Sequence, residues 1–219
     1  MKPKTQKKLT KDTIKIVLHK LQNMYPDAVS ELDYKSPFEL LISTILAAQC
    51  TDVRVNQVTK ELYKKYNKPE DFLSLGEEEL GVIIKSCGFY RNKAKNIINT
   101  CKILVYEYEG QVPQDREELI KLPGVGRKTA NVVISNVFGQ AAIAVDTHVF
   151  RVSNRLGFAK SNNVEDTEEQ LMKNIPKNQW SDAHHWLIYH GRRVCKARRP
   201  LCHECALTNE CLYYRTLVQ

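Results

Sequence analysis

Four cysteines gather near the end of the chain, at Cys195, Cys202, Cys205 and Cys211. One short segment with this spacing could wrap its thiolates around a single tetrahedral ion or a cubane cluster. Structural zinc sites usually show two separated Cys-x2-Cys pairs, whereas this segment has one such pair with wide flanks. The spacing therefore favours an iron–sulfur cluster, with zinc as the alternative.

Cations surround the first of these cysteines, and no acidic residue lies between His190 and Leu201. Ligation of a cluster would close this stretch into a small basic loop that holds its cations ready for backbone phosphates. The alternative is a solvated charged rim beside a structural cluster. The cations that we assign to DNA binding are Arg193, Lys196, Arg198 and Arg199.

A glycine-rich turn, LPGVG at residues 122–126, separates two predicted helices. Its two glycines permit left-handed backbone angles and the close approach of another surface. The amides of the turn and of the next helix N-terminus would then attract a phosphate without reading sequence. A plain helical hairpin is the alternative, but the flanking basic residues favour DNA. The residues assigned to DNA here are Leu122, Gly124, Val125, Gly126, Arg127 and Thr129.

Lys128 lies in the first turn of the second of these helices, next to Arg127. The helix dipole and the neighbouring guanidinium both disfavour the ammonium form there. A neutral amine attacks electrophilic carbon and forms a Schiff base. The sequence thus marks Lys128 as a candidate nucleophile, although one more phosphate-binding lysine is the alternative.

Asp146 directly precedes another predicted helix, in the segment AVDTHVF. The usual reason for an aspartate at this place is an N-cap. A capping carboxylate can also face a cleft, where it would stabilise an oxocarbenium-like sugar or shuttle a proton to or from Lys128. The two roles are compatible.

The elements that must position these residues are helices, because apolar residues recur with helical spacing along almost the whole chain. Ser36 and Glu39 predict a capping box, and the apolar run after them predicts a buried central helix. Gly139, Gly157 and Gly191 stand where C-terminal caps would fall. The fold class is all-α. Predicted helices include residues 53–65, 77–85, 116–122, 128–138, 147–156, 165–174 and 182–189.

The composition fits a globular protein, because 42% of the 219 residues are apolar and no apolar run is long enough to cross a bilayer. The net charge of +8 favours a polyanionic partner, with a basic enzyme as the alternative. The lysine-rich start has no secretory signal and predicts a solvated tail. Clustered thiols in a reducing compartment are typical of metal ligands.

Taken together, these features resemble the endonuclease III family of helix-hairpin-helix DNA glycosylases. The resemblance covers almost the whole chain and implies two helical lobes that flank a DNA-binding groove. One lobe would be a six-helix barrel over residues 30–140, with the helix-hairpin-helix at about 115–138. The other would be a discontinuous iron–sulfur domain of residues 1–29 and 141–219, with its cluster loop at 195–211. The matching segments are SPFELLISTILAAQCTD, LPGVGRKTANVV, AVDTHVFRV, HHWLIYHGR and the four cysteines.

The resemblance also implies roles for single residues. Lys128 matches the Schiff-base lysine of the family and Asp146 its catalytic aspartate, and the four cysteines would hold a [4Fe-4S] cluster. Gln49 matches the residue that fills the hole left by a flipped nucleotide. Phe89 falls where the family wedges an apolar side chain into the opposite strand. Leucine is common at that place, so Phe89 departs from the pattern.

The implied function is base excision repair of double-stranded DNA that contains damaged pyrimidines or abasic sites. A bifunctional DNA glycosylase would remove oxidised pyrimidines, and its AP lyase activity would cut the strand by β-elimination. The alternatives are a monofunctional mismatch or adenine glycosylase, whose relatives replace the lysine, a non-catalytic iron–sulfur DNA-binding module, and a ferredoxin-like electron carrier. We expect a monomer in the cytoplasm that meets the nucleoid through DNA and has no membrane partner.

Overall fold

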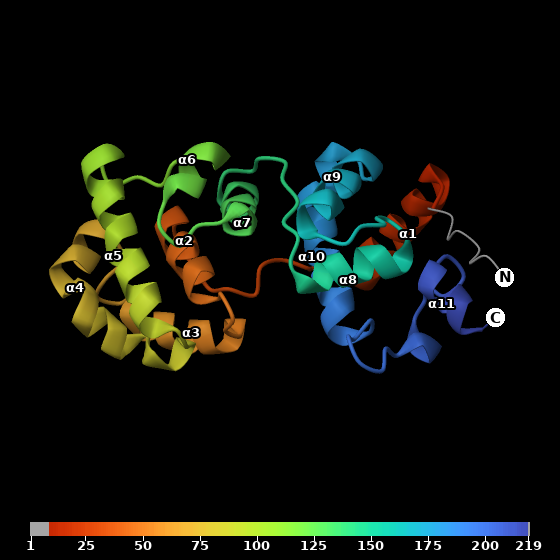
Figure 1. Ribbon diagram of the computed structural model, residues 1–219, viewed down its shortest axis with the longest axis horizontal. Helices are drawn as coiled ribbons and strands as arrows, with labels where there is room; N and C mark the ends of the chain where they lie inside the picture. Colours follow the sequence, from red (N-terminus) through yellow and green to blue (C-terminus); the bar gives the residue numbers. More distant parts are fainter. Residues whose placement is uncertain (1–8, 219) are drawn as a thin grey trace. The chain divides into compact units, whose positions relative to one another are not determined.

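The computed structural model describes residues 9–218, which are helical with no strand in that range (Figure 1). The all-α prediction is confirmed. The chain divides into two compact units, Ser30–Gln140 and Met1–Val29 with Ala141–Gln219. The lysine-rich tail was predicted over residues 1–12, of which residues 1–8 lie outside the described part. Its last two residues, Lys11 and Asp12, begin helix α1 (Lys11–Met24), so the tail prediction is wrong there. Across residues 9–218, the structure contains no helix with the length and apolar character that a bilayer crossing requires.

The Ser30–Gln140 unit is built around one buried helix. Every residue of α2 (Pro37–Leu46) from Phe38 to Leu46 is buried, which confirms the predicted central helix. Figure 1 shows its neighbours around it. They are α3 (Asp52–Leu62), α4 (Pro69–Ile83), the short 3-10 helix η1 (Lys85–Cys87), α5 (Tyr90–Glu107), α6 (Arg116–Lys121) and α7 (Arg127–Val137).

The start of α2 shows how its cap differs from the prediction. The Ser36 hydroxyl accepts a hydrogen bond from the Glu39 amide at 3.1 Å, as an N-cap should. The Glu39 carboxylate, however, accepts from the Lys35 amide and not from the amide of Ser36. The predicted capping box is therefore wrong by one residue, although both side chains still satisfy free amides at the helix entry.

Helix α4 begins at Pro69, eight residues before the predicted start at residue 77. Gly76 interrupts it with φ +79° and ψ 170°, so the helix is kinked there. The kink shifts the buried face of the helix, so the apolar residues before Gly76 and those after it do not fit one continuous helical repeat. The sequence pattern therefore predicted only the second half of α4.

The second unit packs three long helices around a shared apolar core. They are α1 (Lys11–Met24), α8 (Thr147–Leu156) and α10 (Trp180–Arg193). The α1 stripe of Ile14, Val17, Leu18 and Leu21 joins core residues of α8 and α10. The remaining elements are α9 (Val164–Asn174), η2 (Lys177–Gln179), η3 (Cys202–Glu204) and α11 (Leu212–Leu217).

The sequence predicts that Gly157 and Gly191 of this unit end helices, and the structure confirms this for Gly157 alone. Gly157 ends α8 with φ +100°. Gly191 lies inside α10, so that prediction is wrong. A Cβ on Gly191 would stand 3.0 Å from the Cβ of His148 and 3.1 Å from Val152. This glycine therefore lets α10 approach α8 closely, which is a packing role instead of a capping one.

Candidate nucleic-acid interface and cysteine centre

The glycine turn joins α6 to α7 and is held from α5. The Thr100 hydroxyl donates to the carbonyl of Pro123 at 2.9 Å. Gly124 has φ +79°, and a Cβ there would stand 3.1 Å from the Cβ of Asn96. Gly126 has φ −94°, so only one of the two glycines is left-handed. The exposed side of the turn is thus bare backbone, which suits a close approach by phosphate.

Two residues assigned to DNA in this turn have buried side chains. Leu122 is 2% exposed and Val125 is 6% exposed. Both anchor the turn to the helices beneath it, so any contact that they make with DNA would pass through their backbone. Gly124, Gly126 and Arg127 are exposed, and Thr129 is half-buried.

Helix α7 has an open N-terminus. Gly126 is its N-cap residue, and no side chain among residues 9–218 caps the first turn. The first amides of a helix carry partial positive charge and lack intrahelical partners, so this end can bind an anion. Lys128 is exposed at the second position of the helix. A flexible amine therefore stands beside a site that attracts a phosphate.

Asp146 is the N-cap of α8, as one interpretation of the sequence predicted. Its Oδ1 accepts from the amides of His148 at 2.8 Å and Val149 at 2.7 Å. Within the described part of the chain, these two are the hydrogen bonds of this side chain. The carboxylate is half-buried, and both of its hydrogen bonds with the described residues are made by Oδ1. Capping thus fixes the carboxylate in place without using all of its acceptors.

Gln49 and Phe89 lie at two bends of the Ser30–Gln140 unit. Gln49 follows α2 with φ +54°, and Phe89 precedes α5 with φ +46°. Both side chains are exposed, and 64% of the Phe89 surface is open to solvent. A large apolar ring left in water at a bend is able to enter a base stack. The sequence marked both residues by resemblance, but it did not reveal their left-handed backbone.

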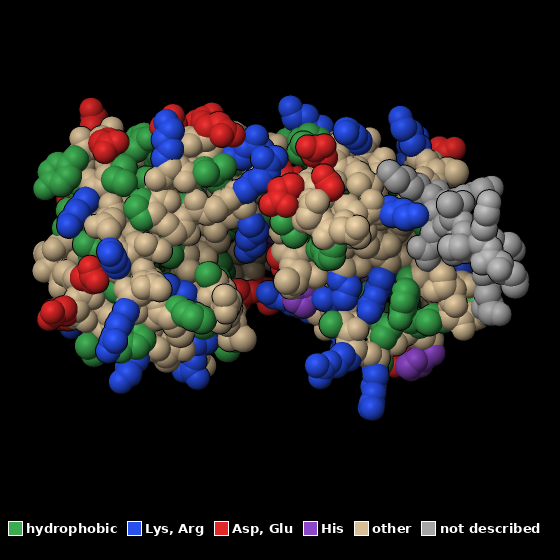
Figure 2. Space-filling view, in the orientation of Figure 1, with side chains coloured by type: hydrophobic (Ala, Val, Ile, Leu, Met, Phe, Trp, Pro, Cys, Tyr) green, Lys and Arg blue, Asp and Glu red, His purple; other side chains and the backbone are tan. Residues whose placement is uncertain are grey.

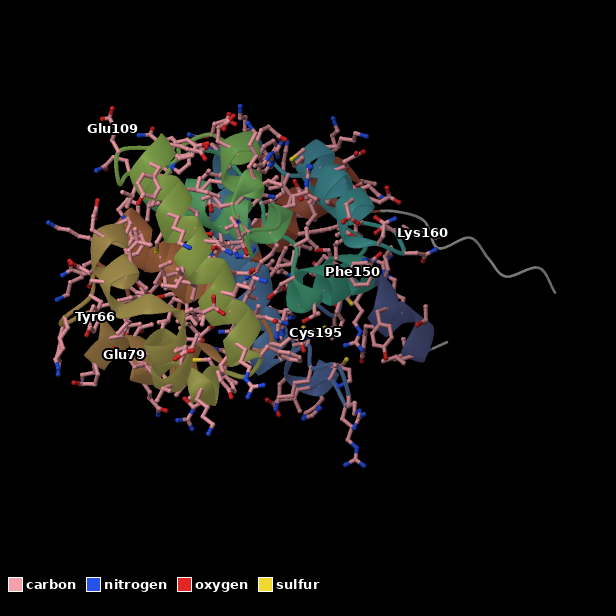
Figure 3. All side chains as sticks on the ribbon, turned by 60° about the vertical axis from the view of Figure 1, so that its left-hand side comes forward. Tyr66, Glu79, Glu109, Phe150, Lys160 and Cys195 are labelled. Atoms are coloured by element: carbon pink, nitrogen blue, oxygen red, sulfur yellow. The ribbon has the colours of Figure 1, made fainter. Side chains whose placement is uncertain are left out.

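The four cysteines of the second unit line one pocket at the end of α10. Figure 3 labels Cys195 just past that helix and Phe150 on α8. Burial raises the pKa of the Cys205 and Cys211 thiols, and the neighbouring cysteines raise it further. Thiols so close together become thiolates when a cation binds them. Across residues 9–218, no group of three or more Cys, His, Asp or Glu side chains has the arrangement that holds a single metal ion.

Two residues besides the four cysteines contact this pocket. Arg155 donates to Cys195 Sγ at 3.5 Å and lies over the Tyr213 ring at 4.6 Å. His190 Nε2 is 3.6 Å from Cys205 Sγ, and its Nδ1 is 3.0 Å from the Tyr25 hydroxyl. Burial lowers the pKa of His190 to about 4. No local pattern marks Arg155, because only the folding of distant segments brings it to the cysteines.

The basic residues beside the cysteines are exposed. Figure 2 shows Lys and Arg side chains on the surface of both units. The Arg193 guanidinium stacks over the Tyr189 ring at 4.4 Å, which fixes its direction. Arg199 has φ +53°, so the loop bends sharply there. All four cations assigned to DNA are exposed, namely Arg193, Lys196, Arg198 and Arg199.

Comparisons with known proteins name the relatives of this chain. Residues 42–177 match the family model "HhH-GPD superfamily base excision DNA repair protein". Endonuclease III of Bacillus subtilis (strain 168) is 54% identical over 199 residues, which cover 90% of this chain and 91% of the relative.

Two solved structures with 52% sequence identity match with a TM-score of 0.92. One is a non-covalent endonuclease III–DNA complex, matched over 96% of this chain and 99% of that chain. The other is a trapped endonuclease III–DNA covalent intermediate, matched over 96% and 100%. The chain therefore belongs to the HhH-GPD superfamily of base excision DNA repair proteins and, within it, to the endonuclease III family.

Proposed function

We propose that Lys128 is the nucleophile with which this chain removes oxidised pyrimidines and then cuts the strand. Membership of the endonuclease III family makes the chain a DNA glycosylase and AP lyase of base excision repair. The observation that carries the residue assignment is the uncapped N-terminus of α7 beside an exposed lysine. A phosphate bound to those amides would bring the adjacent sugar within reach of the amine.

The chemistry follows from an amine acting on a deoxyribose. The neutral Lys128 amine attacks C1′, a bond forms between its nitrogen and that carbon, and the bond to the base breaks. The departing base takes a proton, and opening of the sugar ring gives an imine. The imine makes the 2′-proton acidic, so its removal expels the 3′-phosphate by β-elimination. We assign Asp146 the stabilisation of the positive sugar and the transfer of protons to and from Lys128.

Gln49 and Phe89 would supply the strand distortion that the chemistry needs. A damaged base must leave the stack before C1′ is accessible, and this costs least where stacking is already impaired. Phe89 would enter the opposite strand, and Gln49 would fill the gap left by the flipped nucleotide. Both side chains are exposed at bends, which supports these roles. The exposed cations of the cysteine loop would bind the DNA phosphates. The protein would act in the cytoplasm, bound to the DNA of the nucleoid.

We further propose that the four cysteines hold a [4Fe-4S] cluster. All four line one pocket, and their segment has one Cys-x2-Cys pair with wide flanks in place of the two separated pairs usual for structural zinc. A cubane suits four such thiolates, because each thiolate binds a different iron. When bound, the cluster would cross-link residues 195–211 and thereby fix the basic loop. Ser30–Gln140 would be the helix-hairpin-helix barrel, and the second unit would be the iron–sulfur domain.

Borohydride trapping tests the nucleophile. The wild-type protein should become covalently joined to duplex DNA that contains thymine glycol or an abasic site, because borohydride reduces the imine. Lys128→Ala should bind the same DNA without an adduct, and Lys102→Ala, which removes an exposed α5 lysine, should trap normally. DNA binding by the wild type without any adduct would favour a non-catalytic module. Trapping by Lys128→Ala would assign the amine to another residue.

Metal analysis tests the cysteine centre. The purified protein should show the visible absorbance of an iron–sulfur cluster, with iron and sulfide in equal amounts. A colourless protein with one zinc ion would overturn the cluster proposal and leave the trapping result unaffected.

A further inference from the structure

The two bends that carry Gln49 and Phe89 are conformationally unfavourable. Both are non-glycine residues with left-handed φ angles, +54° and +46°. Left-handed angles bring a Cβ too close to the following carbonyl, so such residues relax unless their surroundings hold them. Each bend has an exposed side chain, so the side chains themselves do not supply the restraint. Hydrogen bonds to the backbone beside the two bends can supply this restraint.

A buried lysine is bonded to the backbone at both bends. Lys93 on α5 is 5% exposed, and its Nζ donates to the carbonyl of Leu46 at 2.8 Å and to that of Cys87 at 2.8 Å. Leu46 is the last residue of α2 and stands three positions before Gln49. Cys87 is the last residue of η1 and stands two positions before Phe89. One ammonium thus joins the two segments that lead into the bends.

The position of this lysine is electrostatically unusual. Burial lowers the pKa of Lys93, and the groups that favour its charge are the Cys50 and Cys87 thiols. None of the ion pairs of the described residues includes it, so its charge is balanced by carbonyl dipoles. The carbonyl end of α2 carries partial negative charge, which favours a cation there. Loss of the ammonium would leave two buried acceptors unsatisfied, one at each bend.

We propose that Lys93 is a positioning residue for base extrusion, holding the Gln49 and Phe89 bends in fixed register through the carbonyls of Leu46 and Cys87. The inference rests on the proposed insertion of those two side chains into DNA. Lys93 itself does not touch the sugar. Its loss should therefore slow the extrusion of a stacked base more than the reaction at a site from which the base is already gone.

The experiment compares two rates in one set of proteins. Lys93→Met keeps an unbranched side chain but removes the donors, and Lys102→Met removes an exposed lysine from the same helix as a matched control. Single-turnover excision from a thymine glycol duplex measures extrusion plus chemistry. Borohydride trapping on an abasic duplex measures the chemistry without a base to extrude. Fluorescence of 2-aminopurine opposite the lesion reports unstacking directly, and thermal unfolding confirms that each protein is folded.

The ratio of excision to trapping should fall by about tenfold in Lys93→Met, the usual effect of losing a hydrogen bond to a charged group, with a matching loss of 2-aminopurine signal. The control should keep the wild-type ratio. An unchanged ratio in the folded variant, or an equal fall in both rates, would overturn the proposal.

A second variant covers a failure of Lys93→Met to fold. Lys93→Gln keeps two N–H donors on a shorter side chain, and its ratio of excision to trapping should also be lower than that of the wild type. Failure of both variants to fold would also overturn the proposal, because Lys93 would then be needed for the fold as a whole. The absence of trapping by the wild type would instead count against the proposed function.

Discussion

Replacement of Asp146 should separate its structural role from its chemical one. Asparagine is as good an N-cap as aspartate, so Asp146→Asn should keep the bonds to the amides of His148 and Val149, now 2.8 and 2.7 Å. Asp146→Asn loses only the negative charge near the helix N-terminus, which should lower the free energy of unfolding by about 0.3–1 kcal/mol. Asp146→Ala loses both bonds, which should lower the free energy of unfolding by about 1–2 kcal/mol.

These energies give measurable differences in thermal unfolding. For a protein of this size, about 1 kcal/mol corresponds to a shift of roughly 2–4 °C in Tm. The alanine variant should therefore melt about 2–8 °C below the wild type, and the asparagine variant within about 4 °C of it. Both variants should lose base excision by about 10²–10⁴-fold, because neither retains a carboxylate for proton transfer.

The assays are circular dichroism melting and single-turnover excision. Asn163→Ala is the control, because Asn163 caps α9 through one bond of 2.7 Å to the Asp166 amide and has no proposed contact with DNA. It should lose stability and keep its excision rate. Excision at the wild-type rate by Asp146→Asn would refute the catalytic role and leave the cap alone. Equal melting temperatures for Asp146→Asn and Asp146→Ala would refute the capping energy.

Four other substitutions give direct tests. Gly124→Ala should lower the free energy of unfolding in urea by about 1–2 kcal/mol, because φ is +79° and the new Cβ would stand 3.1 Å from Asn96. Gly126→Ala, with no atom within 4 Å, should stay within about 0.5 kcal/mol of the wild type, and an equal loss in both would contradict the strain argument. Burial lowers the pKa of His185 from 6.5 to about 4, so the unfolded chain binds more protons in that range. The stability that neutral His185 contributes should fall by about 2 kcal/mol by about pH 5, and His185→Gln should reduce the pH dependence of the free energy of unfolding in urea by that amount. Arg155→Met removes the donor to Cys195 Sγ, so the visible absorbance of the proposed cluster should decay faster in the presence of a chelator. A decay rate equal to that of the wild type would show that Arg155 does not stabilise the cysteine pocket.

Local signals predicted most of the helices. The Ser36 cap, the buried run of α2 and the Asp146 cap each depend on a few neighbouring residues, and the structure confirms all three. The wrong predictions of helix boundaries arose at glycines, because a glycine in the sequence is compatible with more than one local structure. Gly76 is a kink inside α4, whereas Gly191 is a packing position inside α10. A glycine permits a turn, a kink or a close approach, and neighbouring residues alone do not choose among them.

The candidate site shows the same limit. The sequence assigned Leu122 and Val125 to DNA binding, and the structure shows that both side chains are buried, so any contact with DNA would pass through their backbone. One signal could have pointed to Lys93, since it stands four residues before Ile97 and eight before Cys101 on the apolar stripe of α5. A lysine on a buried face needs a polar partner. The sequence did not reveal that its partners are two carbonyls.

The sequence by itself determined the helical class, the N-caps at Ser36 and Asp146, the glycine turn and the grouping of four cysteines. Each of these follows from interactions between residues a few positions apart, whose geometry the chain fixes wherever it folds. The tertiary structure alone decided that Lys93 joins the bends of Gln49 and Phe89 and that Arg155 reaches the cysteine pocket. Those contacts join segments distant in the chain, and they form only because burial of the shared apolar cores brings the helices together.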